Sequence, residues 1–93
     1  MAALQEGDLV GATVAGRQIL ITMVYGQYYA FDARCSHAKQ SLATGRLKDY
    51  EISCPLHGAK FDIRTGACTK APADKPIQTF SVLLEGGKVC VVL

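Results

Sequence analysis

The chain has 93 residues and a mass of 9.9 kDa, which is enough for one domain and too little for two. Hydrophobic residues make up 49% of it and charged residues 19%, a composition that excludes a disordered chain. The net charge of +2 is too small to indicate nucleic-acid binding, and no apolar stretch approaches the about 18 residues of a membrane span. We therefore expect one soluble domain that binds neither nucleic acid nor a membrane.

The first residues do not resemble a secretory signal. No basic segment followed by a run of about 7 to 15 apolar residues is present, so we expect a cytoplasmic protein. In that reducing compartment, the four cysteines are expected to be metal ligands or thiols rather than disulfide partners.

Short runs rich in β-branched and aromatic residues, separated by turn residues, stand at both ends of the chain. They predict antiparallel strands at residues 8–15, 17–25, 27–32, 79–85 and 88–93. Gly16, Gly26 and the pair Gly86-Gly87 fall between consecutive runs, where glycine takes a positive φ without steric cost. The pattern predicts hairpins, and no amphipathic helix accompanies them.

The middle of the chain, from about residue 33 to residue 76, is richer in Gly, Pro, Ser and Lys. Its only apolar pieces are short, at residues 51–54 and 59–63. We interpret it as a subdomain inserted between base strands at about 1–32 and 77–93, all within one domain of residues 1–93. The last two strands must then pair with the first ones across the insertion.

Two Cys-His pairs lie inside this insertion and carry the most specific signal in the sequence. The first is Cys35-Ser36-His37, and the second, sixteen residues later, is Cys54-Pro55-Leu56-His57. Both histidines of the chain belong to these pairs, and thiolate with imidazole is a common metal-ligand set. The spacing predicts one metal centre held between two loops. A zinc site stays open at this point, although a zinc finger usually has two cysteines first and then two histidines on a helix.

The pattern of the two pairs resembles the Rieske 2Fe-2S signature. The resemblance continues through residues 54–66 to Ala71-Pro72. It implies an all-β fold, a Rieske-like antiparallel β-sandwich with a small inserted cluster-binding subdomain, and one 2Fe-2S cluster per chain. By the same resemblance, one iron binds the thiolates of Cys35 and Cys54, and the other binds the imidazoles of His37 and His57.

Departures from the high-potential members of the family indicate that the chain resembles the low-potential members. Those members carry a loop-to-loop disulfide and two hydroxyl donors to the cluster, at positions that hold Gln40, Leu56, Ala59 and Phe61 here. Fewer donors stabilise the added electron less, so we expect a potential of about −150 mV, near the low end of the Rieske range. This pattern is similar to that of monomeric Rieske ferredoxins in aromatic-ring dioxygenase systems, which carry electrons by transient contacts from a ferredoxin reductase to a terminal oxygenase.

The sequence shows no catalytic set of its own. It has only two histidines, and it contains no phosphate-binding or nucleotide-binding fingerprint, so we expect an electron carrier and not an enzyme. Two alternatives remain: a small Rieske subunit of a larger reductase such as nitrite reductase, and a zinc-stapled structural module.

The charges divide unevenly between the two parts of the chain. The insertion holds eight basic and four acidic residues, whereas the remainder holds two basic and four acidic residues. We therefore expect the insertion to face acidic partner surfaces. Cys68 and Cys90 lie outside the motif and are expected to be buried free thiols.

Overall fold

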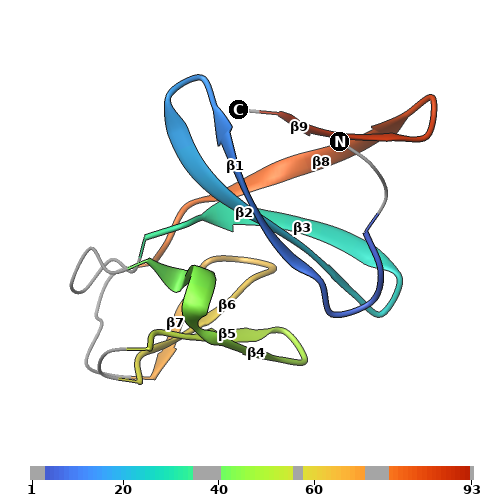
Figure 1. The fold of residues 1–93 in the computed structure, drawn as a ribbon. Helices are drawn as coiled ribbons and strands as arrows, with labels where there is room; N and C mark the ends of the chain where they lie inside the picture. The colour runs from blue at the N-terminus through green and yellow to red at the C-terminus, as the bar shows by residue number, and fades with distance from the viewer. Residues whose placement is uncertain (1–3, 35–40, 56–57, 71–75, 93) are drawn as a thin grey trace.

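The larger sheet of the protein contains five antiparallel strands. In this computed structural model, which describes residues 4–34, 41–55, 58–70 and 76–92, its strand order is β1-β2-β3-β8-β9 (Figure 1). The strands are β1 (Leu9–Val14), β2 (Arg17–Val24), β3 (Gln27–Asp32), β8 (Thr79–Glu85) and β9 (Lys88–Val92). All five were predicted, and each observed end lies within one residue of the predicted end.

Tight turns connect the first three strands. Ala15 and Gly16 join β1 to β2 with φ values of 51° and 79°, and Tyr25 and Gly26 join β2 to β3 with 51° and 77°. Two central residues with positive φ match the right-handed twist of a hairpin, which confirms the predicted reversals.

The pairing of β3 with β8 closes the larger sheet across the middle of the chain. Ala30 pairs with Phe80 and Phe31 pairs with Thr79, in antiparallel register. The last two strands therefore join the first three, as expected, and the intervening segment leaves the sheet after β3 and returns before β8.

A second, smaller sheet lies within that segment, to one side of the larger sheet (Figure 1). Its antiparallel strands are β4 (Arg46–Lys48), β5 (Glu51–Ser53), β6 (Lys60–Asp62) and β7 (Cys68–Lys70), in that order, preceded by a single 3-10 turn, η1 (Leu42–Thr44). The apolar pieces at residues 51–54 and 59–63 correspond to β5 and β6, whereas β4 and β7 were not predicted.

Both faces of the larger sheet are covered, because successive residues of β2 belong to different clusters of buried side chains. Ile19 and Ile21 pack on one face with Val89 of β9. Leu20 packs on the other face with Phe31 and with Phe61 of the smaller sheet. Full burial of each such side chain contributes about 1.5 to 3 kcal/mol, so this shared core fixes the two sheets against each other.

An aromatic contact also joins the two sheets. The ring of Tyr50, between β4 and β5, lies 5.4 Å from that of Tyr25 and 5.9 Å from that of Tyr29, measured between ring centroids. The Tyr25 hydroxyl donates to the carboxylate of Asp49. The guanidinium of Arg64 lies 4.0 Å from the Tyr50 ring centroid, within cation–π distance. These contacts hold the β2–β3 turn beside the β4–β5 turn.

We expect Asp62→Asn to destabilise the protein near neutral pH and to have less effect in acid. The Asp62 carboxylate accepts hydrogen bonds from the Arg64 side chain at 2.8 and 3.1 Å, and these bonds lower its pKa from 3.8. The ionised form therefore stabilises the fold above about pH 4, and this contribution disappears as the pH falls through the lowered pKa. Urea unfolding of both proteins at about pH 6 and pH 3 measures the effect. An equal difference at both pH values would contradict it.

Candidate metal centre

The first predicted ligand loop has a closed base. The backbone N–H of Leu42 donates to the Ala33 carbonyl at 2.7 Å, and Arg34 and Ser41 form an antiparallel bridge. The N–H of Arg34 also donates to the Asp32 carboxylate at 2.9 Å. The predicted ligands Cys35 and His37 lie between these ends, at positions outside the described residues.

The second predicted loop is closed at Cys54. Its backbone N–H donates to the Ala59 carbonyl at 2.7 Å, and its own carbonyl accepts from the N–H of Gly58 at 3.1 Å. Gly58 has a φ of +74°, a conformation that favours glycine. Cys54 is 2% exposed, so its thiol is shielded from water. His57, the last predicted ligand, falls outside the described residues.

The bases of the two loops meet in one hydrophobic core. Ala33 and Leu42, which flank the first loop, belong to the same cluster of buried residues as Cys54 and Ala59, which flank the second. The segments on which the two Cys-His pairs are located are separated by sixteen residues in sequence but are fixed to a common support. Both loops are therefore anchored in the same apolar core.

The described residues fit an iron-sulfur group bound through Cys54. A thiolate sulfur is a soft ligand that suits such clusters. Beside it lies a hollow of about 280 Å³, lined by Thr44, Gly45, Arg46, Ser53, Cys54 and Pro55. The side chains of Ala59 and Phe61 belong to the same buried cluster as Cys54, and they carry no hydroxyl that could donate a hydrogen bond to a sulfur.

Gly45 lets the backbone before β4 pass close to Ser53, a role that the sequence did not predict. A Cβ at this position would lie 2.1 Å from the carbonyl oxygen of Ser53, the residue before Cys54. Because the φ of Gly45 is −73°, the requirement for glycine comes from the close approach of the two backbones and not from its conformation. No local sequence pattern signals such an approach.

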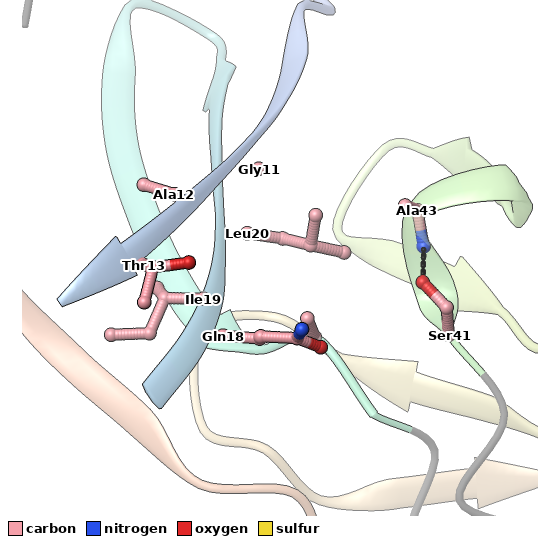
Figure 2. Close-up of a pocket in the computed structure, with 9 residues that line it drawn as sticks. Gly11, Ala12, Thr13, Gln18, Ile19, Leu20, Ser41 and Ala43 are labelled. Atoms are coloured by element: carbon pink, nitrogen blue, oxygen red, sulfur yellow. Dashed lines mark hydrogen bonds between the residues drawn. The ribbon is translucent and has the colours of Figure 1, made fainter. Parts of the chain in front are cut away.

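A separate hollow of about 280 Å³ lies between β1, the start of β2 and η1, and Figure 2 shows side chains that line it. Small residues form most of its wall, among them Gly11, Ala12 and Ala43. Ser41 belongs to the wall too, and its hydroxyl accepts from the N–H of Ala43 at 3.1 Å (Figure 2). The described residues that line it include no cysteine, histidine or acidic side chain.

The two cysteines outside the motif behave differently from the expected buried thiols. Cys68 in β7 and Cys90 in β9 are both half-buried rather than buried. The Cys68 thiol donates to the carbonyl of Lys70 at 3.3 Å.

Within the part of the chain that the structure describes, no helix is long and apolar enough to cross a membrane.

Residues 1–81 match the family model of the Rieske [2Fe-2S] domain. The chain is 39% identical over 90 residues to the ferredoxin component of a naphthalene 1,2-dioxygenase system from Pseudomonas aeruginosa, covering 97% of this chain and 86% of that protein. It is 40% identical over 90 residues to the ferredoxin component of a biphenyl 2,3-dioxygenase from Rhodococcus jostii, covering 97% and 84%.

Solved structures agree with these relatives. The ferredoxin of a carbazole 1,9a-dioxygenase from Nocardioides aromaticivorans superposes with a TM-score of 0.90 at 33% identity, covering 95% of this chain and 86% of that one. A chain from a complex of oxygenase and ferredoxin in carbazole 1,9a-dioxygenase superposes with a TM-score of 0.89 at 31% identity, covering 96% and 92%. The expected all-β, antiparallel fold is thereby confirmed.

Proposed function

Because this chain belongs to the Rieske 2Fe-2S family, we propose that it carries single electrons from a ferredoxin reductase to the terminal oxygenase of an aromatic-ring dioxygenase system. The observation that carries the proposal is similarity along nearly the whole chain to proteins that are themselves ferredoxin components of such systems. One solved neighbour is a ferredoxin in complex with its oxygenase, which supports the oxygenase as the acceptor.

Four residues are proposed to hold the cluster: Cys35, His37, Cys54 and His57. All four lie within the matched residues 1–81, and their order follows the family pattern of two thiolates on one iron and two imidazoles on the other. When bound, a Rieske cluster accepts and releases one electron at a time. Cys54 supplies a buried sulfur whose position is fixed by two backbone hydrogen bonds in its loop. Neutral imidazole in place of thiolate makes the site less negative, which raises the potential above that of all-cysteine ferredoxins.

We propose that residues 1–93 work as one monomeric domain, with the base strands at about 1–32 and 77–93 supporting a cluster-binding subdomain at about 33–76. The pairing of β3 with β8 and the separate β4–β7 sheet support this division. The chain transforms no substrate itself in this proposal. The reducing cytoplasm is the proposed location, and it suits Cys90, which is a thiol.

The test combines composition, spectrum and turnover. Purified protein is expected to hold two irons and two sulfides per chain, to have a midpoint potential of about −150 mV and to restore aromatic dihydroxylation when mixed with reductase and oxygenase. A colourless, zinc-containing protein would contradict the proposal and favour the zinc-stapled module. A potential above about +100 mV would contradict the expected low-potential branch. Permanent association with a large reductase, without turnover in the mixed system, would favour the nitrite-reductase-type subunit instead.

A further inference from the structure

Two arginines flank a polar hollow beside the first ligand loop. The hollow, of about 350 Å³, is lined by residues from the start of β2, the end of β3 and the chain entering β8. Arg17, Asp32, Arg34, Gln78 and Phe80 are among the residues of its wall. Arg17 and Arg34 are both exposed, so their guanidinium groups are within reach of another molecule.

Arg17 is oriented by two uncharged partners, Gln78 and Phe80. Its Nη1 donates to the side-chain oxygen of Gln78 at 3.0 Å, and its guanidinium carbon lies 5.7 Å from the centroid of the Phe80 ring. A guanidinium has five N–H donors in a planar fork, so most of them stay available after one hydrogen bond to an amide. Arg17 is therefore already held in place for a further acceptor.

The wall of this hollow keeps a positive charge. Among the described residues, the only ion pair joins Arg64 to Asp62, so neither Arg17 nor Arg34 is neutralised in this way. Among the described residues that line the hollow, Asp32 is the one acidic residue, and its carboxylate accepts from the backbone N–H of Arg34. Two guanidinium groups and one carboxylate leave an excess positive charge at this position.

The hollow is close in the chain to the proposed cluster ligands. Arg34 directly precedes Cys35, and its bridge to Ser41 closes the base of the loop that contains Cys35 and His37. A protein seated on Arg34 would therefore contact the support of this loop.

From this arrangement we propose that the hollow between Arg17 and Arg34 is a docking site for an Asp or Glu side chain of the terminal oxygenase. The inference rests on the proposed function, because it takes the oxygenase as the partner. A carboxylate matches the fork of a guanidinium and forms charge-assisted hydrogen bonds with it. Complementary charge at a contact rim chiefly raises the rate of encounter, which suits a transient electron carrier.

The experiment compares Arg17→Gln, Arg34→Gln and the double variant with a control, Lys88→Gln, which removes one positive charge at the start of β9. Each holoprotein is first checked for an unchanged visible spectrum and midpoint potential, because Arg34 adjoins a proposed ligand. The Kd for purified oxygenase and the ferredoxin concentration at half-maximal turnover are then measured at low and high ionic strength.

We expect each single substitution in the hollow to raise the Kd about 3- to 10-fold and the double variant to raise it more, with a weaker dependence on salt. Arg17→Lys should recover the salt dependence but only part of the affinity, since it keeps the charge and loses the fork. Lys88→Gln should stay within about twofold of the wild type.

The docking site would be wrong if the double variant kept its spectrum and had the same Kd and the same salt dependence as Lys88→Gln. The proposed function would not be affected by that result. Weaker binding to the reductase alone would overturn the assignment of the oxygenase as occupant. Absence of turnover with the wild-type protein would overturn the proposed function, and the inference with it.

Discussion

Cys54→Ser is expected to yield a folded chain that holds no cluster. A serine hydroxyl stays protonated where a cysteine gives a thiolate, so the substitution removes one of the two proposed sulfur ligands while keeping the side chain nearly the same size. Cys54 is 2% exposed, which leaves little access for water to substitute as a ligand. Substituting a residue that only hydrogen-bonds to a metal ligand already weakens metal binding about 10- to 100-fold. Substituting a ligand itself should weaken cluster binding more.

Iron, acid-labile sulfide and visible absorption measure the result, with Cys90→Ser as the matched control. Cys90 lies in β9 of the larger sheet and is half-buried, so its substitution should leave iron and sulfide at wild-type levels. Far-ultraviolet circular dichroism separates loss of the cluster from loss of the fold. If Cys54→Ser kept two irons and two sulfides per chain, Cys54 would not be a ligand and the proposed site would be wrong.

The strands of the larger sheet could be predicted because their signals are local. Residues 19–25 are almost continuously apolar, and Gly16 and Gly26 are each the second residue of a two-residue turn at either end of β2. A turn of two residues fixes the register of the strands on either side, so β1, β2 and β3 follow from neighbouring residues alone. The pairing of β3 with β8 was predicted from the order of the strands and the insertion along the chain, and not from a local pattern.

The smaller sheet was only half predicted because its strands are three residues long. Periodicity needs more residues than this to be recognised, and β4 contains Arg46, Leu47 and Lys48, of which only Leu47 is apolar. These strands exist because β5 and β6 place Ile52 and Phe61 in the shared core, and β4 and β7 complete their hydrogen bonding. Tertiary packing therefore decides the structure here.

The sequence predicts which residues bind the cluster, but not how the fold supports them. Residue type and spacing predict Cys54 and three further ligands that lie outside the described residues, so the ligand set stays a prediction. By contrast, the contact of Arg64 with Tyr50 and the hollow between Arg17 and Arg34 join residues 14 or more positions apart. Such contacts depend on how strands of both sheets pack, which no short stretch of sequence encodes.

Gly66→Ala is expected to destabilise the protein by about 3 kcal/mol. Gly66 has a φ of +81°, where a Cβ costs about 1 to 2 kcal/mol. That Cβ would also lie 2.0 Å from the carbonyl oxygen of Ile77, so the backbone would have to move, at a further cost of about 1 to 3 kcal/mol. The two residues are hydrogen-bonded, since the N–H of Ile77 donates to the Gly66 carbonyl at 2.9 Å. This contact fixes the point where the chain returns to β8.

Gly16→Ala separates the two causes, because Gly16 has nearly the same φ of +79° but no atom within 4 Å of its added Cβ. It should lose only the conformational part, about 1 to 2 kcal/mol. For a domain of this size, the two thermal midpoints should then differ by about 5 to 15 °C. Equal losses in the two variants would show that Ile77 does not approach Gly66 closely. A larger loss at Gly66, by contrast, would establish that contact with Ile77 holds the smaller sheet to the strands that follow it.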